Sequence, residues 1–196
     1  MKYHLLGQRT GLHVSALALG TGRLDVTEAP RIFAAYAEAG GNFLDTSSAY
    51  LGGKAEELVG DFLATTDRER FVISSKYCQT PFAAPGRSTV GNHRKAMRAE
   101  VEGSLRRLRT DRIDLYFAHF DDGQTPIDEI MRGLDDLVRE GKIVFAGLSN
   151  FPAWRCATGR GFAAGRRSRR SRCSTTSATV TPSASSSPLH GSVGSG

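Results

Sequence analysis

Short apolar runs alternate along the chain with longer segments in which apolar residues recur every three or four positions. The short runs lie at 17–20, 42–45, 70–76, 113–119 and 143–149. They are too apolar to leave one face in water, which is typical of parallel strands covered on both sides. The segments of helical period lie near 28–39, 54–64, 92–109 and 125–140. This alternation predicts an α/β fold with a parallel sheet, either doubly wound or closed into a barrel.

The segment 125–140 has the clearest helical pattern. Thr125 suits an N-cap and Pro126 suits the first helical position. One apolar stripe follows, made of Ile127, Ile130, Met131, Leu134, Leu137 and Val138. Gly141 suits the C′ position, where helices commonly end. The sequence therefore predicts both ends of this helix.

Glycine-rich segments predict turns, not a phosphate-binding loop. Two short runs around Gly7 and Gly11 predict an N-terminal hairpin within 2–15. The segment GTGRLD, at 20–25, lacks the third glycine of the dinucleotide fingerprint. The segment GGKAEE, at 52–57, lacks the P-loop spacing. Neither segment carries a nucleotide-binding motif of these two kinds.

Charge divides the chain into two parts. All 20 acidic residues lie at or before Glu140, whereas seven of the 26 Lys and Arg residues are arginines between Arg155 and Arg172. Residues 1–154 are therefore nearly neutral, and the basic excess belongs to residues 155–196. Ser and Thr make up half of the residues from Ser171 onward, with no apolar period. We expect residues 155–196 to be a disordered Arg/Ser-rich tail.

Cysteine usage and hydropathy point to a cytoplasmic protein. Cys78, Cys156 and Cys173 form no C-x-x-C pair and no Cys/His metal spacing, so we expect reduced thiols and no metal. The first residues, MKYHLLGQRTG, lack the apolar core of a signal peptide. No apolar run approaches the roughly 20 residues that cross a bilayer, so we expect no membrane partner.

Polar groups follow three successive strands of the predicted sheet. Asp45 ends the second apolar run and Tyr50 lies in the loop after it, while Lys76 and His119 end the next two runs. In a barrel, the carboxyl ends of all strands open onto one face, where active sites are built. Taken singly, the aspartate suits a turn cap, the tyrosine suits packing, the lysine suits solvent and the histidine suits a structural role. Together they predict a catalytic cluster.

Such a cluster is suited to proton donation to a carbonyl oxygen. A tyrosine hydroxyl is a weak acid at neutral pH, and a nearby lysine ammonium favours its ionised form. Asp45 can hold the ammonium of Lys76 by an ion pair. His119 can donate a hydrogen bond that orients the substrate oxygen. Hydride would come from a cofactor across the barrel mouth.

Several motifs, in order from Val14 to Trp154, resemble the aldo-keto reductase family. They are AGGNFLDTSSAYLGGKAEELVGDFL, FVISSKY, DRIDLYFAHFDDGQTPIDEIMRGLDDLVREGKI and AGLSNFPAW. The resemblance implies a (β/α)8 barrel of the TIM type that reduces aldehydes and ketones with NADPH. It implies Tyr50 as the acid, tuned by Lys76 and Asp45, with His119 orienting the carbonyl.

The resemblance also implies cofactor contacts. These are Gly20 and Thr21 after the first strand, Asp45 at the end of the second, and Ser149 and Asn150 after the fifth. In the family, the last two hold the nicotinamide carboxamide. The structural alternative is that Ser149 and Asn150 only form a turn before Pro152. NADH stays open as an alternative to NADPH, as do the natural carbonyl substrate and the oligomeric state.

The family pattern stops after SNFPAW, with five strands present where the family has eight. We therefore interpret residues 1–154 as a partial barrel, and expect a poorly stable, inactive chain. A one-nucleotide slip of the reading frame between Trp154 and Ala163 would explain the tail. When residues 166–188 are back-translated with GC-rich codons and read one base out of frame, the result resembles the family's sixth strand. One competing interpretation is a nucleic-acid-binding arm, although the tail has no aromatic beyond Phe162 for base stacking, so no specific nucleic acid is expected. A non-catalytic interaction protein is a third interpretation.

Overall fold

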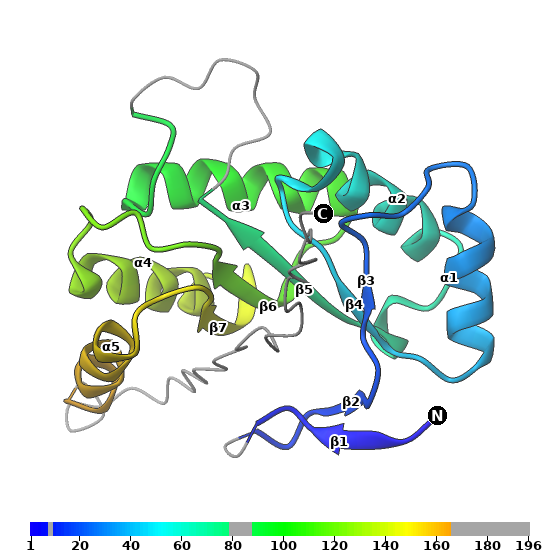
Figure 1. Ribbon diagram of the computed structural model, residues 1–196, viewed down its shortest axis with the longest axis horizontal. Coiled ribbons are helices and arrows are strands. Elements are labelled where there is room, and N and C mark those ends of the chain that lie inside the picture. The colour runs from blue at the N-terminus through cyan, green and yellow to red at the C-terminus, as the bar shows by residue number, and fades with distance from the viewer. Residues whose placement is uncertain (8–9, 79–87, 166–196) are drawn as a thin grey trace, which may run out of the picture.

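A parallel sheet of five strands, with helices along its outer side, forms the centre of the protein in the computed structural model (Figure 1). The structure describes residues 1–7, 10–78 and 88–165. The sheet contains β3 (Leu19–Gly20), β4 (Phe43–Asp45), β5 (Val72–Tyr77), β6 (Ile113–Ala118) and β7 (Ile143–Leu148). All five apolar runs of the sequence are therefore strands, each shortened at one or both ends. The predicted parallel sheet is confirmed.

The strands lie in the sheet in the order in which they occur in the chain, β3-β4-β5-β6-β7, and every neighbouring pair is parallel. Crossovers between parallel strands are right-handed, so a strictly sequential order places all the connecting helices on one face. A doubly wound sheet would reverse its order at a switch point and carry helices on both faces. The described sheet is therefore an arc of a (β/α)8 barrel.

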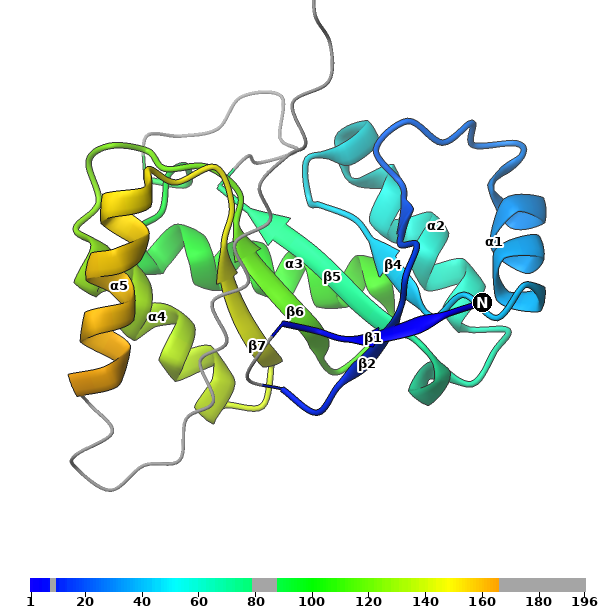
Figure 2. The ribbon, with the colours of Figure 1, turned by 60° about the horizontal axis from the view of Figure 1, so that its bottom comes forward.

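Helices connect the strands and pack side by side around this arc, as Figure 2 shows. They are α1 (Ala29–Glu38), α2 (Lys54–Leu63), α3 (Arg94–Leu108), α4 (Ile127–Arg139) and α5 (Ala153–Gly165), with short 3₁₀ turns η1 (Tyr50–Gly53) and η2 (Arg68–Arg70). Gly141 follows the C-cap of α4 with φ at +74°, as the sequence predicted for a C′ glycine. The Thr125 prediction is wrong: Pro126 is the N-cap, and the Thr125 hydroxyl donates to Asp122 at 2.6 Å instead.

The predicted boundary at Trp154 falls inside a helix. Helix α5 runs on to Gly165, and the Arg155 side chain, assigned to the tail from its composition, is 12% exposed and packs against the loop before α4. Its guanidinium donates to the Thr125 carbonyl at 2.7 Å and pairs with Asp121 at 3.0 Å. Residues 155–165 are thus helical, not disordered. The rest of the tail, including Cys173 and the arginines from Arg166 on, lies outside the described residues.

The predicted hairpin is present, as β1 (Tyr3–Leu5) paired antiparallel with β2 (His13–Ser15). Asn42, just before β4, accepts from the Ser15 backbone at 2.7 Å and donates to the His13 carbonyl at 3.2 Å. The Tyr3 hydroxyl donates to the Gly40 carbonyl at 2.6 Å. The hairpin is therefore fixed to the amino-terminal end of the sheet.

Alternate residues of the central strands face opposite sides of the sheet. Ile73 and Tyr77 of β5 and Tyr116 of β6 belong to the buried core beneath the helices, where the two tyrosine rings stack with centroids 5.4 Å apart. Ser74 and Lys76, between them in β5, point to the other face and bond to Asp45. The period-2 alternation of a strand thus delivers Lys76 to the inner side of the arc. Among the described residues, no helix is long and apolar enough to span a membrane.

Candidate active site

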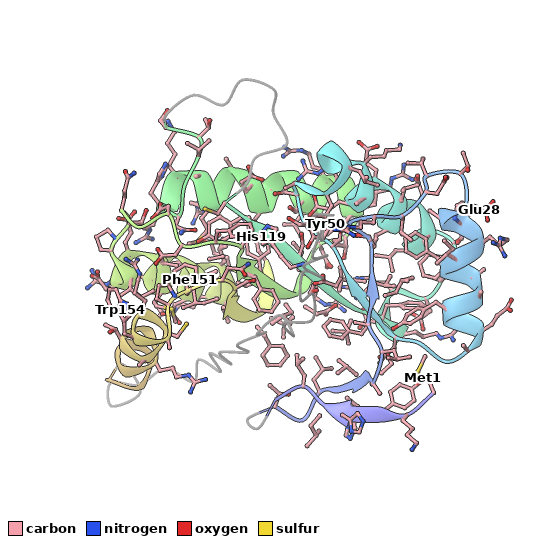
Figure 3. The ribbon with its side chains drawn as sticks, viewed as in Figure 1. Met1, Glu28, Tyr50, His119, Phe151 and Trp154 are labelled. Atoms are coloured by element: carbon pink, nitrogen blue, oxygen red, sulfur yellow. The ribbon has the colours of Figure 1, made fainter. Side chains whose placement is uncertain are left out.

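The four residues predicted to be catalytic meet at the carboxyl-terminal edge of the sheet. Asp45 is the last residue of β4, Lys76 is the penultimate residue of β5, and His119 directly follows β6. Tyr50 begins η1, in the connection after β4. Figure 3 labels Tyr50 and His119 on neighbouring parts of this edge. The strand-end positions foreseen in the sequence therefore place these side chains in contact.

Asp45 and Lys76 form a close ion pair. The Lys76 ammonium lies 2.8 and 2.7 Å from the two carboxylate oxygens and also donates to the Thr46 carbonyl at 2.9 Å. The Ser74 hydroxyl donates to the same carboxylate at 2.5 Å. Because the lysine is buried, the carboxylate and carbonyl replace the water that a charged ammonium requires.

The ammonium also reaches Tyr50. The Nζ atom of Lys76 lies 3.3 Å from the Tyr50 hydroxyl oxygen and 4.8 Å from the ring centroid. Gly22 packs close to the same ring, because a Cβ there would lie 3.4 Å from it. Asp45, Lys76 and Tyr50 therefore form one continuous hydrogen-bonded chain that ends at the phenol.

His119 completes the cluster as a neutral ring. Burial, and secondarily the Lys76 charge, lower the pKa of His119 to about 4. The imidazole stacks on Phe120 with centroids 4.3 Å apart and meets the Tyr50 ring edge-on with centroids 5.8 Å apart. At neutral pH the ring thus carries one N–H, and it can donate or accept at each nitrogen but not donate from both.

Sequence reasoning missed Ser47, the side chain in direct contact with this histidine. Its Oγ lies 3.3 Å from Nδ1 of His119 and is fully buried. Ser74, which donates to Asp45, was also missed. The alternation within β5 places residue 74 on the same face as Lys76, so this second contact could have been found from the strand pattern. The first could not, because Ser47 lies in an irregular loop.

The predicted cofactor residues near β3 lie beside Asp45. Thr21 is buried, and both its backbone N–H, at 2.9 Å, and its hydroxyl, at 3.1 Å, donate to the Asp45 carbonyl. A Cβ added at Gly20 would meet no described atom within 4 Å, so the space beside it is open. Thr21 therefore braces the end of β4, and its cofactor contact stays a prediction.

Ser149 and Asn150 follow β7 at the same edge. The Ser149 backbone donates to the Ala118 carbonyl at 2.9 Å, and the Asn150 amide donates to the His119 carbonyl at 2.9 Å and to the Ser149 hydroxyl at 3.0 Å. Asn150 has φ at +55°, a left-handed conformation that asparagine tolerates better than most residues. A hydroxyl and an amide oxygen stand beside the histidine, and this pair suits a carboxamide such as that of nicotinamide. The cofactor role of both residues stays a prediction.

Comparison with known proteins identifies the family to which these motifs belong. The family model described as the aldo/keto reductase family matches residues 14–159. A norsolorinic acid reductase of Aspergillus flavus is 37% identical over 169 residues, which cover 78% of this chain and 44% of the relative. An aryl-alcohol dehydrogenase [NADP(+)] of Phanerodontia chrysosporium is 35% identical over 173 residues, covering 78% and 45%. An aldo-keto reductase of Emericella nidulans is 34% identical over 171 residues, covering 78% and 43%.

The chain spans less than half the length of these relatives. The matched residues include the whole five-stranded arc and the four clustered side chains, and they end within α5. From its sequence match and its sheet topology, the chain belongs to the aldo/keto reductase family.

Proposed function

We propose that residues 14–159 supply the proton-donating and carbonyl-orienting groups of an NADPH-dependent reductase that converts aldehydes or ketones to alcohols. The observation that carries this proposal is the chain of contacts from Asp45 through Lys76 to the Tyr50 hydroxyl, with neutral His119 at its side. Such an arrangement presents one acidic hydroxyl, one fixed cation and one neutral donor to the same small space.

Tyr50 is the proton donor in this proposal. The reduced nicotinamide, when bound, supplies a hydride to the carbonyl carbon, and the Tyr50 hydroxyl gives its proton to the carbonyl oxygen. The phenolate that remains faces the Lys76 ammonium 3.3 Å away, which stabilises the negative charge. Asp45 keeps the ammonium in place. General acid catalysis of this kind contributes about 10²–10⁴-fold to a rate.

His119 orients the substrate in this proposal. A neutral imidazole that donates one hydrogen bond to the carbonyl oxygen fixes its direction without competing with Tyr50 for the proton. Its low pKa, about 4, keeps the ring uncharged through the neutral range, so the nearby Lys76 remains the only cation of the cluster. The histidine therefore directs the oxygen, and the tyrosine protonates it.

Ser149 and Asn150 would hold the nicotinamide carboxamide, with Gly20, Thr21 and Asp45 lining the opposite side. The NADP(+) in the printed name of the Phanerodontia chrysosporium relative supports NADPH, and the open space beside Gly20 leaves room for a cofactor. The printed name of that relative, an aryl-alcohol dehydrogenase, also favours an aromatic carbonyl compound as substrate. Aromatic aldehydes are therefore the first substrates to test.

The chain by itself is expected to be inactive. The described strands form an arc whose edges, β3 and β7, do not pair with each other. Misplacement of a reacting group by about 1 Å costs about 100-fold in rate, and an unclosed arc does not fix the distance between the residues after β3 and those after β7. The arginine-rich segment from Arg166 on lies outside the described residues. Within the described residues, no contact favours nucleic-acid binding.

A chimera tests the proposal directly. Residues 14–159 would replace the matched segment of the Aspergillus flavus relative, and NADPH oxidation would be followed with aromatic aldehydes and ketones. We expect activity in the chimera and its loss with Tyr50→Phe. The full chain serves as the comparison, with quenching of its single tryptophan, Trp154, by NADPH as the binding readout. A folded chimera whose activity is unaffected by Tyr50→Phe would refute the assignment.

A further inference from the structure

We propose that Ser47 is a positioning residue that sets the tautomer of His119. In this proposal, the Ser47 hydroxyl donates to Nδ1 and thereby keeps the single hydrogen of the neutral ring on Nε2. The catalytic consequence rests on the proposed function, because only an Nε2–H could donate from this ring to a carbonyl oxygen. The tautomer itself is a property of the folded chain and can be measured without turnover.

The hydrogen bonds of Ser47 define the two possible tautomers of His119. Its Oγ lies 3.3 Å from Nδ1 of His119 and 3.4 Å from the Lys76 carbonyl oxygen, and it accepts from the Ala49 backbone N–H at 3.3 Å. A serine hydroxyl has one hydrogen to give. If that hydrogen goes to Nδ1, the ring hydrogen is on Nε2. If it goes to the carbonyl, Nδ1 must carry the ring hydrogen to bond the serine oxygen.

The partners of the two competing acceptors favour the first arrangement. The Lys76 carbonyl already accepts from the Ser48 backbone N–H at 3.1 Å. Within the described residues, Nδ1 of His119 has no hydrogen-bond partner besides Ser47. Donation to Nδ1 also leaves the serine oxygen with one donor, the Ala49 N–H, whereas the second arrangement would require that oxygen to accept from both Ala49 and Nδ1. The Ser47 hydrogen is therefore better used on Nδ1.

The ring has little freedom to escape this contact. It stacks on Phe120 and meets Tyr50 edge-on. The His119 backbone is held on both sides, because its N–H donates to the Tyr77 carbonyl at 2.9 Å and its carbonyl accepts from the Asn150 amide at 2.9 Å. Ser47 itself is fully buried, so water does not compete for its hydroxyl. The low pKa of the ring supports a single hydrogen at neutral pH.

Nitrogen NMR of the full chain at pH 7 tests the tautomer. Long-range ¹H–¹⁵N spectra distinguish a nitrogen that carries hydrogen from one that does not, and a His119→Gln variant identifies the His119 signals. We expect an unprotonated Nδ1 and a protonated Nε2 in the parent chain. A protonated Nδ1 in the parent chain would overturn the proposal, whether or not any variant folds.

Three substitutions test the cause. Ser47→Ala should reduce the ratio of Nε2–H to Nδ1–H about five-fold, which is the effect of losing one neutral hydrogen bond. Ser47→Thr retains the hydroxyl and should restore the parent ratio, whereas Ser48→Ala removes the neighbouring buried hydroxyl and should leave the ratio unchanged. An unchanged ratio in Ser47→Ala would contradict the proposal.

Kinetics in the chimera separate this proposal from the proposed function. Ser47→Ala should lower kcat several-fold with a smaller change in KM, and Ser47→Thr should recover most of the loss. If the chimera has no activity but the tautomer shifts as expected, the positioning of the ring stands and the reductase assignment fails. A chimera that is active and indifferent to Ser47→Ala would instead refute the catalytic role of the serine.

Discussion

An ion pair lies at the amino-terminal edge of the sheet and another at the carboxyl-terminal edge, where the strands begin and end. The two pairs differ in whether their hydrogen bonds end in a group that can react. At the amino-terminal edge, the Arg68 guanidinium bonds to Asp114 at 2.7 Å, to Thr110 at 3.2 Å and to the carbonyls of Phe71 and Arg112 at 2.7 and 3.2 Å. At the carboxyl-terminal edge, the Lys76 ammonium bonds to Asp45 and ends at the Tyr50 hydroxyl.

Under the proposed function, this difference separates stability from chemistry. Asp114 also accepts from the Ile73 backbone at 2.7 Å, so the network around Arg68 ties η2, β5 and β6 together through protein groups alone. The chain from Asp45 to Tyr50 ends in a hydroxyl that retains its own proton to give. Barrel enzymes place their chemistry at the carboxyl ends of the strands and use the opposite end for stability. The charges of this arc follow that division.

The strongest test of the comparison is Lys76→Met in the chimera. Without the ammonium, a Tyr50 phenolate is unsupported, and we expect kcat to fall about 10²–10⁴-fold. The free energy of unfolding should fall by only about 1–2 kcal/mol, because the Asp45 carboxylate is partly exposed and keeps the Ser74 hydrogen bond. Steady-state kinetics and urea unfolding measure the two effects. A large loss of stability with activity retained would invert the comparison.

The matched change at the other edge is Arg68→Met. It leaves Asp114 without its cation and removes the guanidinium donors from the Phe71 and Arg112 carbonyls, of which the Arg112 carbonyl keeps the Thr110 hydroxyl, so we expect a loss of about 3–4 kcal/mol in the free energy of unfolding. The activity per folded molecule of the chimera should change less than about three-fold, because Arg68 is not expected to contact the transition state. Urea unfolding of the full chain gives the first quantity. If Arg68→Met cost less stability than Lys76→Met, the assignment of this edge to stability would be wrong.

The pH dependence of stability distinguishes the two edges, because, of these two groups, only the cluster at the carboxyl-terminal edge contains a histidine with a shifted pKa. The pKa of His119 is about 4 in the folded chain and about 6.5 when unfolded, so the unfolded state binds more protons between these values. Stability from this group is complete above pH 6.5 and is lost as the pH falls to 4, by about 3 kcal/mol. His119→Gln should remove this part of the pH dependence, and Arg68→Met should leave it intact. Urea unfolding at several pH values measures the slope.

Two glycines give the smallest contrast. Gly141, before β7, has φ at +74°, so Gly141→Ala should cost about 1–2 kcal/mol through left-handed strain. Gly20→Ala meets no described atom within 4 Å and should leave stability unchanged, but it would fill the space beside Asp45. We expect it to weaken NADPH binding in the chimera. Thermal unfolding and NADPH titration measure the two effects, and normal NADPH binding by Gly20→Ala would remove this residue from the cofactor site.

Local patterns were sufficient for most of the elements. The apolar stripe of α4, the glycine after it and the short runs of the strands depend on interactions within a few residues, and their positions agree with the structure. The boundary at Trp154 and the cap at Thr125 failed for one reason. Composition and propensity cannot anticipate a tertiary partner, and here Asp121 holds Arg155 while Asp122 takes the Thr125 hydroxyl.

The sequence by itself determined that Asp45, Lys76 and His119 lie at the ends of successive strands, because each apolar run is a local pattern that marks where its strand stops. Only the tertiary structure decided what those side chains touch. The Ser47–His119 contact joins residues 72 positions apart, and the polar contacts of Thr21 and Asn150 depend on loops without any period. A strand pattern fixes the edge at which a side chain emerges, whereas the packing of the loops decides which atoms meet there.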